Sequence, residues 1–170
     1  SLGKMDKTAS GMNIRSENIN ELVEQILKRL RPIAASRNVE VIFESFRPVT
    51  AEVDEMKLSL AISNLVENAI KYNVPQGKVW VTTRRVGDRV RLEVADTGVG
   101  IPQEDMPKIF QRFYRVDKAR SRAAGGTGLG LSIVRDAVRR HGGEITVAPR
   151  TSAGVVFTVL LLAEEGGAPS

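Results

Sequence analysis

The chain has 170 residues, of which 42% are hydrophobic and 26% charged, as is usual for a soluble globular protein of one domain. It has no cysteine, which excludes disulfide, zinc-thiolate and cysteine-nucleophile chemistry, and no apolar run approaches the ~20 residues of a membrane span. The net charge of +5 would suit nucleic acid, but only 5% of residues are aromatic and no basic stretch contains interleaved stacking platforms. We therefore expect no nucleic-acid partner, because a polyphosphate ligand explains the local basicity as well.

The first predicted element is a helix from Ile19 to Ala35, with apolar residues at helical spacing and Pro32 in its last turn or at a kink. Residues 1–16 show no period and are expected to be a disordered lead-in or an expression-vector remnant. The domain is predicted to span residues 17–163, and a disordered tail is expected at 164–170. Val39–Glu44 is strand-like, and Thr50–Val53 could be its short partner strand.

The remaining elements follow from N-caps, turn residues and periodicity. They are a helix capped by Asp54 and running to Tyr72, strands Lys78–Val86 and Arg89–Ala95 joined by a tight turn, a short helix at Asp105–Phe110, a helix at Thr127–Arg140, and strands Glu144–Val147 and Val155–Leu162. Helices and strands come in blocks rather than in strict alternation. This order predicts an α+β sandwich with helices on one face of a mixed sheet.

The helix after Asp54 carries two lines of side chains. Its apolar stripe comprises Leu58, Ala61, Ile62, Leu65, Ala69 and Tyr72. Asn64, Asn68 and Lys71 lie on the flank of that stripe, where an amide oxygen can ligate Mg²⁺ and an ammonium can meet a phosphate. Two asparagines at this spacing are also compatible with an ordinary solvated helix face.

A second motif, Asp96-Thr-Gly98-Val-Gly100-Ile101-Pro, directly follows a predicted strand. An ionised aspartate only accepts hydrogen bonds, so it suits an exocyclic amine such as that of adenine. The glycines allow the backbone to approach a flat base or to take positive φ, although the same residues are usual in a plain turn. A dinucleotide fingerprint would need a third glycine and an immediate helix, which Ile101-Pro102 does not supply.

A third motif, Gly125-Gly-Thr-Gly-Leu-Gly-Leu131, runs straight into a predicted helix and can present backbone N–H groups to an anion. It is neither a Walker loop nor a kinase glycine-rich loop. Before it lie the aromatic and basic run Phe110–Arg115 and a polar, small-residue stretch. Together these could form a mobile lid over a phosphate tail, or a plain surface loop.

In this order and spacing the motifs resemble the histidine-kinase branch of the ATPases that also include DNA gyrase, Hsp90 and MutL. Asn64–Tyr72 resembles the N box, Asp96–Pro102 the first glycine box, Phe110–Arg115 the F box and Gly126–Leu131 the second glycine box. With its flanking elements the resemblance covers about 140 residues. It implies a two-layer α/β sandwich of the Bergerat ATP-binding type, with about five strands packed on about three helices and a mobile ATP lid.

The resemblance also implies roles for individual residues, with ATP and Mg²⁺ as cofactors. Asn68 would ligate Mg²⁺, Asn64 would lie on the same wall, Lys71 would reach the phosphates and Tyr72 would pack near the adenine. Asp96 would bind the adenine amine, and three residues would shape its pocket: Gly98, Gly100 and Ile101. Phosphate contacts on the lid side would come from Gly126, Thr127, Gly128, Leu129 and Gly130, joined by Arg115.

Related hydrolases place a general-base glutamate where this chain has Asn64, and Glu67 projects about 100° away from Asn68 around the helix. The site is therefore expected to bind Mg·ATP and to hydrolyse it poorly. In histidine kinases the γ-phosphoryl group passes to a histidine on a separate dimeric hairpin. His141 lacks the acidic residue that follows such an acceptor, so it is expected to cap its helix through terminal carbonyls.

The resemblance implies two partners, the dimerisation hairpin of a parent kinase and a response regulator. It implies a cytoplasmic domain that is monomeric in isolation, within a homodimeric parent anchored in the bacterial inner membrane. Three alternatives stay open: a self-contained ATPase of the MutL kind, a serine kinase of the anti-sigma kind, and a non-catalytic nucleotide sensor.

Overall fold

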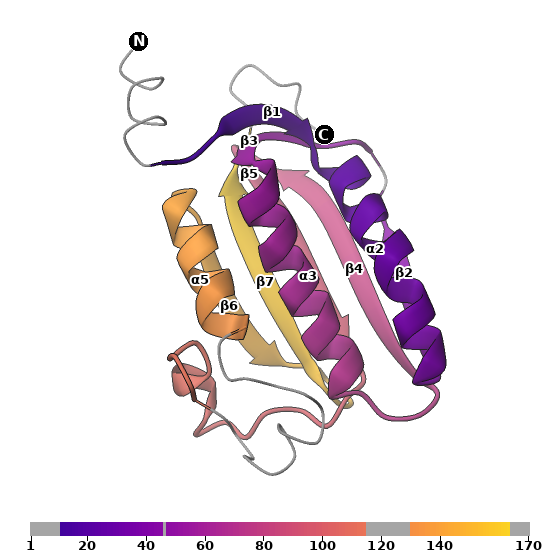
Figure 1. Ribbon diagram of the computed structural model, residues 1–170. Coiled ribbons are helices and arrows are strands. Elements are labelled where there is room, and N and C mark those ends of the chain that lie inside the picture. Colours follow the sequence, from indigo (N-terminus) through magenta and orange to yellow (C-terminus); the bar gives the residue numbers. More distant parts are fainter. Residues whose placement is uncertain (1–10, 46, 115–129, 164–170) are drawn as a thin grey trace.

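The computed structural model describes residues 11–45, 47–114 and 130–163, and Figure 1 shows their arrangement in two layers. Three helices of the described residues lie side by side over one face of a five-stranded sheet: α2 (Ile19–Ser36), α3 (Glu55–Lys71) and α5 (Gly130–Arg140). A two-stranded ribbon of β1 (Ile14–Asn18) and β3 (Thr50–Asp54) crosses one end of the layers. The predicted sandwich is confirmed. Of the residues predicted to form a lid, 110–114 and Gly130 are described, and 115–129 lie outside the described residues.

The helices form where apolar spacing and capping residues agree. The Asn18 side chain caps α2 by accepting the Glu21 N–H at 3.1 Å, and α2 continues past Pro32 to Ser36. The apolar stripe predicted for α3 is buried from Leu58 to Ala69, while Tyr72, the C-cap, is half-buried. This burial fixes which flank of α3 faces α5.

The large sheet has the order β2-β4-β5-β7-β6, and only the β2–β4 pair is parallel. Its strands are β2 (Val39–Glu44), β4 (Gly77–Val86), β5 (Arg89–Asp96), β6 (Glu144–Pro149) and β7 (Val155–Leu162). The predicted β4–β5 turn is confirmed, with Val86 opposite Arg89 and Gly87 at φ +63°. The expectation that Thr50–Val53 pairs with β2 is wrong. Strand β3 pairs with β1, and β2 pairs in parallel with β4 across a connection that contains β3 and α3.

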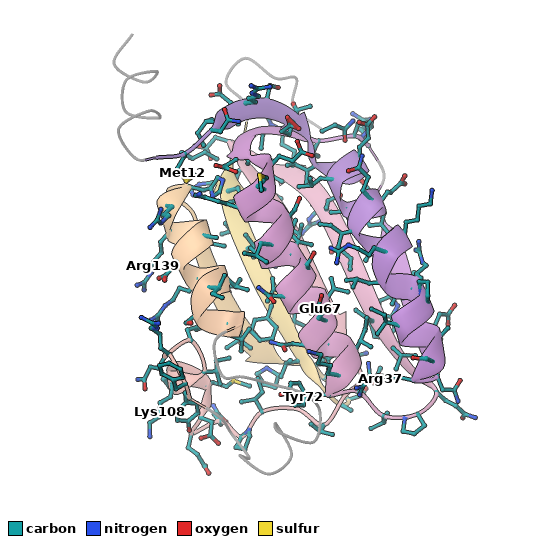
Figure 2. The ribbon with its side chains drawn as sticks, in the orientation of Figure 1. Met12, Arg37, Glu67, Tyr72, Lys108 and Arg139 are labelled. Atoms are coloured by element: carbon teal, nitrogen blue, oxygen red, sulfur yellow. The ribbon has the colours of Figure 1, made fainter. Side chains whose placement is uncertain are left out.

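The predicted end of the lead-in at residue 16 is wrong, because residues 14–16 belong to β1. Met12 is already buried and lies at the end of α5 in Figure 2. The Asn13 N–H donates to the Asp54 carboxylate at 2.9 Å, which holds the start of β1 against the start of α3. The described part of the chain thus enters the fold at the N-terminus of α3. The other residues of the expected lead-in and tail, 1–10 and 164–170, lie outside the described residues.

The remaining loop between β5 and α5 contains a short 3-10 helix, η1 (Met106–Lys108), within the range predicted as helical. Phe110 beyond it is buried and meets the Phe157 ring edge-on at a centroid distance of 6.1 Å. In the described residues no helix is long and apolar enough to cross a membrane.

We expect the Asp54 carboxylate to stabilise the fold more at neutral pH than in acid. Burial raises the pKa of Asp54, but N–H groups of Asn13 and Lys57 and the Lys57 ammonium outweigh it and hold this pKa below its ordinary 3.8. Stabilisation by a carboxylate with a lowered pKa is complete above the ordinary pKa and is lost as the pH falls through the folded-state value. Denaturant unfolding should therefore find Asp54→Asn about 1 kcal/mol less stable than wild type at neutral pH. This difference should shrink below about pH 4, and a constant difference would contradict the assignment.

Candidate functional site

The buried carboxylate of Asp96 lies at the end of β5 and is the centre of the candidate site. Only 7% of the residue is exposed, and its Oδ1 accepts the Gly98 N–H at 2.8 Å. Burial raises the pKa of Asp96, opposed by hydrogen bonds from the Gly98 and Val155 N–H groups and by the Arg150 charge. Such a group offers acceptor lone pairs in a low-dielectric setting, where an N–H donor of a ligand is bound strongly.

The turn between β6 and β7 packs directly against this carboxylate, which the sequence did not predict. A Cβ at Gly154 would lie 1.9 Å from the Asp96 carbonyl oxygen and 2.6 Å from its Oδ1, and Gly154 has φ +83°. Arg150 closes the same turn, since its N–H donates to the Gly154 carbonyl at 3.0 Å and its guanidinium lies 4.7 Å from the Trp80 ring centroid. The turn therefore packs against Asp96 in addition to the hydrogen bond from Gly98.

Hydrogen bonds join the end of α3 to the segment after Asp96. The Val99 N–H donates to the Tyr72 carbonyl at 3.1 Å, and the Thr97 hydroxyl donates to Asn73 Oδ1 at 3.0 Å. Gly98 is required here, because its Cβ would lie 2.5 Å from the Tyr72 carbonyl oxygen. These contacts bring the end of the first predicted motif against the start of the second. Asn73 and Thr97 were not predicted, since both are ordinary turn residues in the sequence.

The two amides of α3 meet the start of α5. Asn64 and Asn68 are half-buried, and a Cβ at Gly130 would lie 3.8 Å from Asn64 Oδ1 and 3.9 Å from Asn68 Nδ2. Gly130, the last glycine of the predicted second glycine box, therefore lies next to the predicted magnesium-binding flank. In the described residues no group of three or more His, Cys, Asp or Glu side chains is arranged to hold a metal ion.

The F-box segment supports this region through aromatic contacts. The Arg135 guanidinium of α5 lies 5.7 Å from the Phe110 ring centroid. The Tyr114 hydroxyl donates to the Asp105 carboxylate, and this bond raises the pKa of Tyr114. The Arg135 contact ties the loop after Asp96 to α5, and the Tyr114 bond joins two parts of this loop.

The predicted site residues thus fall into three groups. Those on the second half of α3, at the end of β5 and at the start of α5 make or adjoin the contacts just described: Asn64, Asn68, Tyr72, Asp96, Gly98 and Gly130. Lys71 is the last residue of α3, while Gly100 (φ +77°) and the partly buried Ile101 lie beyond Gly98; Figure 2 shows Tyr72 at the same end of α3. Arg115, Gly126, Thr127, Gly128 and Leu129 lie outside the described residues.

Helices on one face of a mixed sheet, with a buried strand-end aspartate next to a helix that carries two asparagines, define the sandwich of an ATPase catalytic domain. A family model described as histidine kinase-, DNA gyrase B-, and HSP90-like ATPase matches residues 53–165, and the chain belongs to this family.

Relatives with high similarity are sensor histidine kinases. The sensor-like histidine kinase SenX3 of Mycobacterium tuberculosis is 36% identical over 149 residues, which are 88% of this chain and 36% of SenX3. The chain thus spans about a third of the length of this curated relative.

Solved histidine kinase catalytic domains share the fold. The nucleotide-free catalytic domain of ThkA has a TM-score of 0.80 and 31% identity, covering 89% of this chain and 97% of that one. Full-length ShkA in complex with AMPPNP has a TM-score of 0.80 and 28% identity, and the match covers 94% of this chain and 33% of ShkA. ThkA in complex with the response regulator protein TrrA has a TM-score of 0.75 and 29% identity, covering 89% and 42%.

Proposed function

We propose that this chain binds Mg·ATP and supplies its γ-phosphoryl group to a histidine of a sensor kinase. The observation that carries this proposal is the junction of the buried Asp96 carboxylate, held by two backbone N–H groups, with the end of α3. A buried acceptor suits the amino group of adenine. The Asn64 and Asn68 amides one to two turns before that end would then face the phosphates and the metal.

Each site residue has a proposed role in this arrangement. Asp96 binds the adenine amine, Tyr72 packs near the base, and Gly98, Gly100 and Ile101 shape its pocket. Asn68 ligates Mg²⁺ through its amide oxygen, with Asn64 beside it and Lys71 near the phosphates. Backbone N–H groups at the start of α5 suit an anion, and the phosphate-binding set there is Arg115, Gly126, Thr127, Gly128, Leu129 and Gly130.

The phosphoryl acceptor is proposed to lie on another segment of the parent protein. His141 is the single histidine of this chain, and both of its ring nitrogens are engaged, one with the Ala137 carbonyl at 2.7 Å and one with the Asp54 N–H at 3.0 Å. An acceptor needs a ring nitrogen free to attack phosphorus. We therefore expect no histidine phosphorylation when this chain alone is incubated with Mg·ATP.

The similarity to sensor kinases supports the wider assignment. We propose a dimerisation hairpin and a response regulator as partners, no nucleic acid as a partner, and a monomeric state for the isolated chain. The parent protein is proposed to be a homodimer anchored in the bacterial inner membrane, with this domain in the cytoplasm. Residues 17–163, extended at the front to include β1, would form the ATP-binding domain.

Calorimetric titration with Mg·ATP tests the nucleotide assignment. We expect micromolar-range binding by wild type. Asn68→Ala should weaken it at least tenfold in the presence of Mg²⁺, because the variant loses a metal ligand. The matched control is Glu67→Ala on the same helix, which should bind like wild type.

Steady-state ATP turnover separates the enzyme classes. We expect almost none, because Asn64 stands where the hydrolases carry a general base. Rapid turnover that Glu67→Ala abolishes would favour the self-contained ATPase, and phosphorylation of a partner serine would favour the serine kinase. No nucleotide binding by wild type would contradict the proposal.

A further inference from the structure

Helices α3 and α5 are joined at both ends. They lie side by side and run in opposite directions (Figure 1). At one end Gly130, which begins α5, lies against Asn64 and Asn68 of α3. At the other end His141, just after α5, reaches Asp54, just before α3. A contact at the second end can therefore determine how the two helices align at the first.

The His141 contact is directional, and its chemistry fixes one form of the ring. The Asp54 N–H can only donate, so Nε2 must accept in this 3.0 Å bond, which joins residues 87 apart in the sequence. The Ala137 carbonyl can only accept, so Nδ1 must carry the proton in the 2.7 Å contact. The structure thus specifies a neutral imidazole with its proton on Nδ1.

Asp54 makes this contact a meeting point of three elements. Its N–H donates to Nε2 of His141, which follows α5. Its Oδ1 accepts the Lys57 N–H and caps α3, and its Oδ2 accepts the Asn13 N–H at the start of β1. The incoming chain and both helices of the candidate site are therefore fixed at one point. We call these three residues, Asn13, Asp54 and His141, the α3–α5 junction.

Apolar packing alone defines the position of α5 along its own axis less sharply than the His141 hydrogen bond does. Val134 and Val138 are fully buried, but apolar contacts are non-directional, so they define the position of α5 along its axis less directly than a hydrogen bond does. A hydrogen bond is directional, and it weakens steeply once the angle at the hydrogen falls below about 120°. Asn64 lies ten residues beyond Asp54, or about 15 Å along α3. Because a helix is rigid over this length, a shift of α5 at the junction would also displace Gly130 relative to Asn64.

We propose that His141 is a positioning residue for the nucleotide site, which sets the register of α5 on α3 and so the distance of Gly130 from the two asparagines. The inference rests on the proposed function, since it assigns His141 an effect on nucleotide affinity. A glutamine at this position can offer an acceptor to the Asp54 N–H, whereas leucine cannot.

Titration of the full chain with Mg·AMPPNP tests the inference. His141→Leu should weaken binding about tenfold, and His141→Gln should stay within about threefold of wild type. Val138→Ala is the matched control, because it removes a buried side chain of the same helix and leaves the junction intact. It should lower the melting temperature with little change in affinity. Wild-type affinity in His141→Leu, equal losses in Leu and Gln, or an equal loss in Val138→Ala would each overturn the proposal.

Nitrogen-15 NMR supplies a second measurement that needs no nucleotide. The single histidine gives an unambiguous ring signal, which should show the proton on Nδ1, and a proton on Nε2 would overturn the proposal. The amide signals of Gly130 and Asn68 should shift in His141→Leu and stay in place in His141→Gln. If wild type binds no nucleotide, the proposed function fails, and these signals still test whether His141 sets the register of α5 on α3. If His141→Leu does not fold, the ring signal and the glutamine variant decide it.

Discussion

Asp96→Asn should abolish most nucleotide binding while leaving the fold nearly as stable as wild type. The substitution keeps the size of the side chain but replaces an acceptor oxygen with an NH₂ donor, which faces the donor of the ligand. Removing one partner of a buried, charge-assisted hydrogen bond costs several kcal/mol, so affinity for Mg·ATP should fall about 100-fold or more.

Stability should respond differently because of the raised pKa of Asp96. A buried carboxyl with a raised pKa is ionised at a cost in stability above that pKa, so loss of the charge offsets the weaker bond to Val155. We expect a melting temperature within about 5 °C of wild type.

The matched control for Asp96→Asn is Asp136→Asn. It makes the same chemical change at an exposed position of α5 and should bind like wild type. Calorimetry and thermal melting on the three proteins distinguish the outcomes. Undiminished binding by Asp96→Asn would remove this residue from the site, and a large fall in melting temperature would make its role structural.

The elements predicted correctly from sequence are those whose signals are local. The α3 pattern from Leu58 to Ala69 repeats every three or four residues, and Asp54 supplies the cap within one turn, so nothing distant is needed. The β4–β5 hairpin is equally local, because Gly87 sets the turn and the strands follow from it. Asp96 and its glycines were found for the same reason, as a short motif at a strand end.

The missed features depend on pairing between distant segments. Strand β1 has no alternating apolar pattern, and it is a strand because Ile14–Asn18 pairs with Thr50–Asp54. Strand β2 pairs with β4 rather than with β3, its neighbour in sequence. The connection from β2 to β4 contains α3, which gives it the length that a parallel pair requires. The contact of Gly154 with Asp96 and that of His141 with Asp54 likewise join residues that look like ordinary turn and cap residues locally.

The turn at Gly154 gives the largest stability effect that we expect from a single methyl group. Gly154→Ala places a Cβ 1.9 Å from the backbone oxygen of Asp96, which cannot move aside as a flexible side chain could, and it forces alanine to φ +83°. We expect a loss of about 3 kcal/mol or more, or roughly 10 °C in melting temperature.

Gly87→Ala is the matched control for the backbone part of this cost, since Gly87 has φ +63° and nothing within 4 Å of the added Cβ. It should lose only about 1 kcal/mol. Because the clash falls on Asp96 itself, Gly154→Ala should also bind Mg·ATP more weakly at temperatures where it is fully folded, and Gly87→Ala should not. Equal losses of stability in the two variants would mean that strained φ explains the effect, and that the β6–β7 turn does not hold Asp96 in place.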